Sequence, residues 1–188
     1  MQNTNLLQGD QVRLTALSEE DLPLLWHWYQ DAGFLRLLNA TPAQPRSKKQ
    51  LRSWIENSSA SDRDMTLAIR TLDDDRLLGY VELDGILWNQ GVASLSIAIG
   101  NRDAWGRGYG REALALILRF AFQELNLHRI GITVFSYNQR AIALYESLGF
   151  QKEGAMREFV HRDGQRHDML VYGLLRHEWR APGEEAGN

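Results

Sequence analysis

Hydrophobic and polar residues alternate with a period of two over several stretches, which predicts strands. These stretches are Gln11–Leu17, Met65–Ile69, Leu77–Leu83, Ala93–Ile99 and His128–Phe135. The acidic run Asp73–Asp75 predicts a hairpin turn rather than a metal site, because no second group of ligands lies near it in the sequence. Two final strands are expected after Gly149, joined by a turn at Asp163–Gly164.

Four stretches have helical spacing instead. The first opens at the cap pair Ser18 and Asp21, the second runs from Ser47 to about Asn57, the third covers Arg111–Leu125, and the fourth runs from Asn138 to about Leu148. The resulting order is strand, two helices, three strands, helix, strand, helix and two strands. This order predicts an α+β fold with a mixed sheet.

Length and composition indicate one globular domain over residues 11–180. The chain has 188 residues, of which 44% are hydrophobic and 24% charged, and no repeat is visible. Residues 181–188 (APGEEAGN) are small, acidic and contain Gly and Pro, so a disordered tail is expected there.

Charge and hydropathy narrow the possible partners and location. The 21 Lys and Arg against 24 Asp and Glu give a net charge of −3, which argues against nucleic acid as the main partner. The longest apolar stretch, Ala113–Leu118, is far shorter than a membrane span, and the first ten residues are polar. A cytoplasmic protein without membrane contact is therefore expected.

Cysteine and histidine usage restricts the chemistry. The chain contains no cysteine, which excludes disulfides, thiolate metal sites and a cysteinyl acyl-enzyme. The five histidines show no metal-binding spacing, so no metal is expected.

A glycine-rich turn precedes the third helix, in the segment Trp105-Gly-Arg-Gly-Tyr-Gly-Arg-Glu112. Its three glycines allow a ligand close to the backbone, and the free N–H groups of the helix start favour a phosphate or pyrophosphate. A flexible connector would use the same residues, so the turn alone leaves both interpretations open. Its G-x-G-x-G spacing matches neither the dinucleotide fingerprint nor a P-loop.

Two separated motifs together resemble a known family. They are NRDAWGRGYGREALA (residues 101–115) and LHRIGITVFSYNQRAIALYESLGFQKEG (residues 127–154). In order and spacing they are similar to the acetyl-CoA-binding core of the GNAT superfamily of N-acetyltransferases, in the branch of ribosomal-protein N-terminal acetyltransferases and spermidine acetyltransferases. The resemblance covers residues 11–180 and implies a single GNAT-like domain with a central, largely antiparallel sheet and helices on both faces.

The resemblance also implies an acetyl-CoA site. The family's pantetheine arm lies between two splayed strands, which assigns hydrogen bonds to the backbone of Ile97, Ala98 and Ile99. The pyrophosphate would rest on the N–H groups of six consecutive residues, with Arg107 and Arg111 adding charge. The six are Gly106, Arg107, Gly108, Tyr109, Gly110 and Arg111. Trp105 stands where the family has Arg or Gln, so that side-chain contact is missing, and Asn138 matches the family's asparagine and is also a plain helix cap.

Tyr145 matches the family's general acid, although its spacing alone fits a core aromatic residue. Attack of an amine on the thioester forms a tetrahedral oxyanion, and its collapse expels the CoA thiolate. A tyrosine with an ordinary pKa near 10 can protonate such a leaving group. Without cysteine, the expected route is direct transfer.

The general base is less clear, because Ser94 stands where many relatives have Glu. Glu82 is the first candidate, although an outward-facing carboxylate is the simpler interpretation. The alternatives are Asp84, Ser94 or Ser136 acting through water, or an amine that is already neutral. An inactive CoA-binding or regulatory module is the competing function. The acceptor is expected to be a small amine or a protein N-terminus, and the protein a monomer or homodimer.

Overall fold

A computed structural model describes residues 5–180, so the expected tail at 181–188 lies outside the described residues. Its strands are β1 (Val12–Ala16), β2 (Met65–Thr71), β3 (Leu77–Leu87), β4 (Val92–Ile99), β5 (Arg129–Phe135), β6 (Gln151–Arg162) and β7 (Gln165–Leu175). Its helices are α1 (Leu22–Trp28), α2 (Ala32–Leu38), α3 (Lys48–Ala60), α4 (Tyr109–Gln123) and α5 (Gln139–Ser147). Short 3-10 turns precede α1 and α4, at Glu19–Asp21 and Arg102–Ala104.

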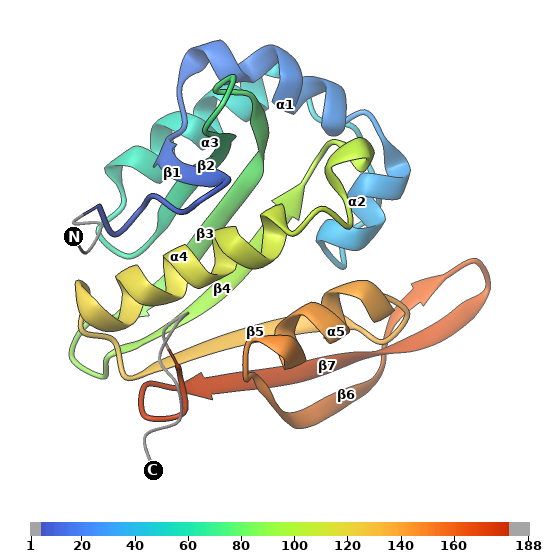
Figure 1. Cartoon of the computed structure of the whole chain (residues 1–188). Coiled ribbons are helices and arrows are strands. Elements are labelled where there is room, and N and C mark those ends of the chain that lie inside the picture. The colour runs from blue at the N-terminus through green and yellow to red at the C-terminus, as the bar shows by residue number, and fades with distance from the viewer. Residues whose placement is uncertain (1–4, 181–188) are drawn as a thin grey trace.

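The strands form one sheet in the order β1-β2-β3-β4-β5-β7-β6 (Figure 1). Every neighbouring pair is antiparallel except β4 and β5, which are parallel. The predicted mixed, largely antiparallel sheet with helices on both faces is therefore confirmed. The turns predicted at Asp73–Asp75 and Asp163–Gly164 are present, with Asp75, Asp163 and Gly164 at positive φ.

The predicted order of elements was wrong in one place, because it omitted α2. This seven-residue helix is capped by Asp31, whose side chain accepts a hydrogen bond from Gly33 N–H at 2.7 Å. Seven residues are too few to show a clear helical period. Two helix bounds also shift: α3 continues to Ala60, and α4 covers 109–123 rather than 111–125.

The two faces of the sheet bury different helices. Side chains alternate along a strand, so Val81 and Ile97 point to the face covered by α4 and α5, whereas Tyr80 and Ala98 point to the face covered by α1, α2 and α3. Figure 1 shows α4 and α5 lying on the same side of the sheet. No helix within residues 5–180 combines the length and the apolar character needed to cross a membrane.

β4 and β5 separate after a short parallel ladder. Within the described residues this ladder joins Val92–Ser94 to Arg129–Gly131. Beyond it, β4 continues along β3 to Ile99 and β5 continues along β7 to Phe135. The middle of the sheet therefore opens at this point.

Candidate functional site

A cavity of about 510 Å³ lies where β4 and β5 separate. Its walls come from the ends of both strands, the glycine turn before α4, the first two turns of α5, and α2 with the loop that follows it. Most of the predicted site residues therefore meet in one place, although they are distributed over 49 positions of the sequence between Ile97 and Tyr145.

The cavity reaches both faces of the sheet. Ile97, Leu144 and Tyr145 line it on the face of α4 and α5, whereas Ala98 and Phe135 line it on the face of α2. The cavity therefore has a wall on each face of the sheet, and the two walls join at the gap between the strands. We call these two parts the α5 half and the α2 half.

The glycine turn closes one end of the α5 half. Gly106 and Gly108 have φ values of 75° and 88°, a region that side chains disfavour, and Gly108 is the N-cap of α4. A Cβ on Gly106 would meet open space, so the backbone here is accessible to a ligand. The first N–H groups of α4 have no acceptor within the helix and point toward the turn.

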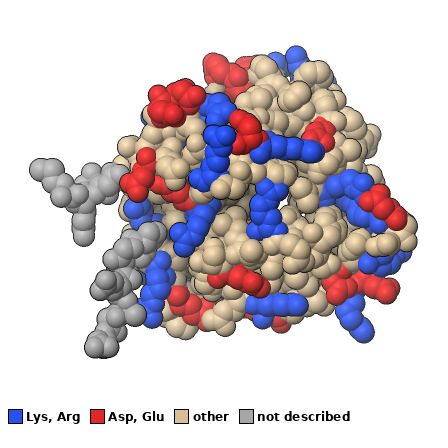
Figure 2. All heavy atoms as spheres, turned by 45° about the vertical axis from the view of Figure 1, so that its right-hand side comes forward, with Lys and Arg blue, Asp and Glu red and all other residues tan. Residues whose placement is uncertain are grey.

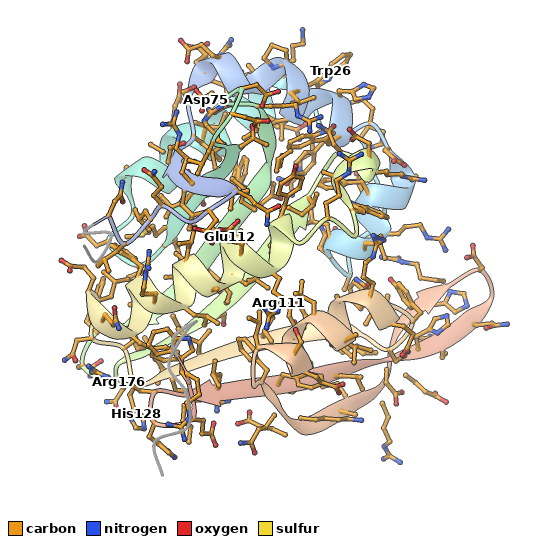
Figure 3. The ribbon with its side chains drawn as sticks, in the orientation of Figure 1. Trp26, Asp75, Arg111, Glu112, His128 and Arg176 are labelled. Carbon is orange, nitrogen blue, oxygen red and sulfur yellow. The ribbon has the colours of Figure 1, made fainter. Side chains whose placement is uncertain are left out.

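The arginines and the tyrosine of this turn differ in position. Arg111 lines the cavity and lies between α4 and α5 in Figure 3, whereas Glu112 lies on the other side of α4 and accepts a hydrogen bond from Gln11 N–H at 3.1 Å. Arg107 is exposed outside the cavity, and the Tyr109 side chain packs against the core. The structure therefore brings Arg111 to the predicted site, but not the side chains of Arg107 and Tyr109.

The register of β4 decides which backbone groups face the gap. Gly100 N–H donates to the Leu78 carbonyl on β3, so by alternation the backbone groups of Ala98 also point to β3. Those of Ile97 and Ile99 point toward β5, although the Ile99 carbonyl already accepts the Trp105 indole N–H at 3.0 Å. This register argues against the predicted backbone contact from Ala98, although the residue does line the cavity.

Asn138 and Tyr145 both line the cavity from α5. The Asn138 side chain accepts from Ala141 N–H at 3.3 Å, which confirms the predicted helix cap. Tyr145 is 6% exposed, and burial raises its pKa to about 12. Because its ring also packs with Phe150, it belongs to the core and to the cavity wall at the same time.

Glu82 does not line the same cavity as Tyr145. It lies in a neighbouring pocket beneath α3, where it accepts from the Thr66 hydroxyl at 3.3 Å. Its cross-strand partner is Ser96, which does line the cavity. Burial, and then the nearby Asp84 carboxylate, raise the pKa of Glu82. Ser94 pairs with Asp84 and is exposed.

Arg140 is a cavity residue that the sequence did not single out. Its guanidinium stacks on the Trp105 ring, 3.7 Å from the ring centre, and so joins α5 to the glycine turn. Trp105 is the residue that replaces the family's Arg or Gln. The aromatic side chain thus holds a guanidinium beside the glycine turn.

Most residues of the α2 half were also missed, because α2 itself was not predicted. It is lined by Phe34, Leu37, Leu38, Asn39, Ala40, Ser96, Ala98, Thr133, Phe135 and Met169. The tip of the β6–β7 hairpin holds this wall in place, since Asp163 accepts from the Arg36 guanidinium at 2.5 Å.

On the side of the molecule shown in Figure 2, Lys and Arg alternate with Asp and Glu, with uncharged surface between them.

Comparison with known proteins identifies the same family that the sequence motifs resemble. Residues 11–151 match the acetyltransferase (GNAT) domain family. The uncharacterized N-acetyltransferase YokL from the SPbeta prophage of Bacillus subtilis (strain 168) is 29% identical over 171 residues, which cover 91% of this chain and 93% of the relative. The ribosomal protein uS5-alanine N-acetyltransferase of Escherichia coli (strain K12) is 29% identical over 113 residues, 59% of this chain and 57% of the relative. The crystal structure of spermidine N-acetyltransferase from Vibrio cholerae in complex with CoA and spermine shares the fold, with a TM-score of 0.82 at 24% identity, over 90% of this chain and 98% of the other.

Proposed function

The chain belongs to the GNAT acetyltransferase family and is an N-acetyltransferase; from that premise we propose that it transfers the acetyl group of acetyl-CoA directly to a primary amine. The observation that carries this proposal is the cavity that opens through the sheet between β4 and β5. A cavity that reaches both faces of the sheet suits a reaction in which both substrates are bound together.

Acetyl-CoA would occupy the α5 half. The unpaired backbone of β4 at Ile97 suits the amides of the pantetheine arm, in the manner of an added strand. The N–H groups from Gly106 to Arg111 suit the pyrophosphate. Arg111 and Arg140 both line this half, and we assign to Arg140 the charge-assisted contact that Trp105 cannot make.

Tyr145 is the proposed general acid. With a pKa of about 12 its hydroxyl stays protonated at neutral pH, so it is available to donate to the departing thiolate. The same burial disfavours the thiolate, because any anion is less stable in an apolar site. The pKa values of the acid and of the leaving group therefore rise together.

Glu82 is the proposed base, acting from the edge of the α2 half. Directly paired residues on antiparallel strands have Cβ atoms about 5 Å apart, so the Ser96 hydroxyl or one water can connect Glu82 to the cavity. The raised pKa of Glu82 makes it a stronger base than an exposed carboxylate.

Two measurements on the full chain test this function. Acetyl-CoA at millimolar concentration is expected to raise the melting temperature, and a panel of amines is expected to release free CoA thiol. Absence of a shift would contradict the proposed cofactor. A shift without thiol release for any amine would favour the non-catalytic CoA-binding module instead.

A further inference from the structure

The α2 half of the cavity has an apolar surface. Phe34, Phe135 and Met169 are 7%, 6% and 9% exposed, and Leu37 and Leu38 line the wall beside them. The polar residues in this half are Asn39, Ser96 and Thr133, all of them uncharged. Whatever binds here must be mainly apolar where it contacts the wall.

Charge is distributed unequally between the two halves. Among the described residues that line the cavity, the charged ones are Arg111 and Arg140, both on the α5 half, and none is Asp or Glu. Two nearby carboxylates are already paired with arginines: Asp163 binds Arg36, and Asp31 binds Arg102 at 2.8 Å. Glu82 lies in the separate pocket beneath α3.

This distribution disfavours an acceptor with several ammonium groups. Each ammonium that leaves water needs a carboxylate or an equivalent partner. Glu82, connected through Ser96, is proposed to serve the reacting amine, and the lining of the α2 half supplies no second carboxylate. The rings of Phe34 and Phe135 can interact with one cation, but this is a weaker substitute for a carboxylate. An acceptor with one amine on an apolar group loses less hydration and gains contact with the wall.

The wall is held in place, so its shape is set before binding. Tyr137 donates from its hydroxyl to the Arg36 carbonyl at 2.6 Å, and Arg162 donates to the carbonyls of Asn39 and Thr41 at 3.1 and 3.0 Å. These contacts fix both the end of α2 and the loop after it. The wall therefore has little freedom to rearrange around a polycation.

We propose that the acceptor is a primary monoamine carried on an uncharged apolar group, and that polyamines are poor substrates. This inference rests on the proposed acetyl transfer. Two sources share this chemistry: the α-amino group of a peptide with an apolar first residue, and a small alkyl or aryl amine.

A comparison of kcat/KM with saturating acetyl-CoA tests the proposal. The panel contains phenethylamine, a peptide beginning with Leu, the same peptide beginning with Asp, and spermidine. We expect phenethylamine or the Leu peptide to exceed spermidine by at least about tenfold, the size of discrimination that an apolar pocket provides, and the better of the two identifies the source. Equal or faster turnover of spermidine would overturn the proposal while leaving acetyl transfer intact. Failure of acetyl transfer itself would appear separately, as absence of a thermal shift with acetyl-CoA.

A matched pair of variants tests the role of the wall. Leu37→Glu adds a carboxylate to the α2 half, and Leu37→Gln makes nearly the same change in shape without the charge. Both are expected to lower kcat/KM for the apolar amine, but only Leu37→Glu is expected to raise it for spermidine. Asn39→Asp, a smaller change, repeats the test if Leu37→Glu does not fold. An unchanged preference in every folded carboxylate variant would overturn the proposal.

Discussion

The two halves of the cavity are lined by different kinds of chemical groups. The α5 half offers backbone groups, the glycine turn and two arginines, whereas the α2 half offers apolar side chains held by hydrogen bonds to the β6–β7 hairpin. The first half depends on φ angles and strand register. The second depends on which side chains happen to line it.

The two halves therefore differ in how a side-chain substitution affects them. Most donors of the α5 half are backbone groups, so side-chain substitutions leave them in place, and a cofactor common to many proteins suits such a site. The α2 half is lined mainly by side chains, so we expect a single substitution to change its preferred ligand. The following predictions test whether cofactor binding depends on the α5 half and acceptor choice on the α2 half, and which residues carry out the chemistry.

The largest effect is expected for Tyr145→Phe. Loss of the hydroxyl removes the proposed acid, so kcat should fall by about 10²-fold. The stabilisation by acetyl-CoA should persist, because the ring still lines the cavity. Steady-state kinetics and thermal shifts on the same preparation measure both properties.

Tyr172→Phe serves as the matched control. Its hydroxyl donates to Glu146 at 2.9 Å and lies outside the cavity lining. Activity close to that of the unchanged protein is expected. Equal losses in both variants would indicate a general effect of losing a tyrosine hydroxyl, and would remove the proposed acid.

Glu82→Gln is expected to lower kcat by about tenfold at pH 7, a modest loss for a base that acts through an intermediary. The pKa of Glu82 is raised by burial, so in the unchanged protein activity should decline as pH falls through that raised value, because the base becomes protonated. The variant should recover at higher pH, where the amine loses its proton unaided. A pH series of kcat from 6 to 10 measures this.

Asp84→Asn separates the two carboxylate candidates on β3. Asp84 pairs with Ser94, which does not line the cavity, so this variant should retain most of its activity. A larger loss in Asp84→Asn than in Glu82→Gln would contradict the proposed base.

Arg140→Ala is expected to have a smaller effect, confined to the KM for acetyl-CoA. Loss of a partly exposed charge-assisted contact should raise the KM for acetyl-CoA by roughly fivefold and leave kcat similar. Trp105→Leu should reproduce part of this effect, because the ring positions the guanidinium. In the double variant the two effects should not add.

Arg157→Ala removes an exposed arginine of β6 that does not line the cavity, and so controls for a general change of charge. If it raised the KM for acetyl-CoA as much as Arg140→Ala, the assignment of Arg140 would be incorrect.

Local sequence patterns were sufficient to predict most of the fold. Alternation with a period of two and the caps at Ser47 and Asn138 predicted strands and helices that the structure confirms. The helix α2 was missed because its signal was a single Asp31 cap before seven residues, too few for a period to appear. That omission concealed most of the residues that line the α2 half of the cavity.

The prediction of site residues from the sequence was limited in a similar way. Those assigned through the motifs, such as Gly108 and Tyr145, do meet at the cavity. Arg140 and Trp105 are 35 positions apart in sequence, and nothing in their spacing indicates that they stack. The side of β4 that each backbone group faces is a property of pairing, and so the contact predicted for Ala98 could not be judged before the register was known.

The smallest expected effect is an absence of change, in the alkaline part of the pH profile. A tyrosine with the ordinary pKa of about 10 is half ionised at pH 10, whereas one with a pKa of about 12 is roughly 1% ionised there. If Tyr145 is the acid, kcat with both substrates saturating should stay constant from pH 8 to 10. Bound substrates exclude more water from the cavity, which disfavours the phenolate further. A decline with a midpoint at or below pH 10, in protein that circular dichroism shows to be folded, would mean that the acid is a different group or that Tyr145 is solvated during turnover. In the second case the α5 half would admit more water than the 6% exposure of Tyr145 implies.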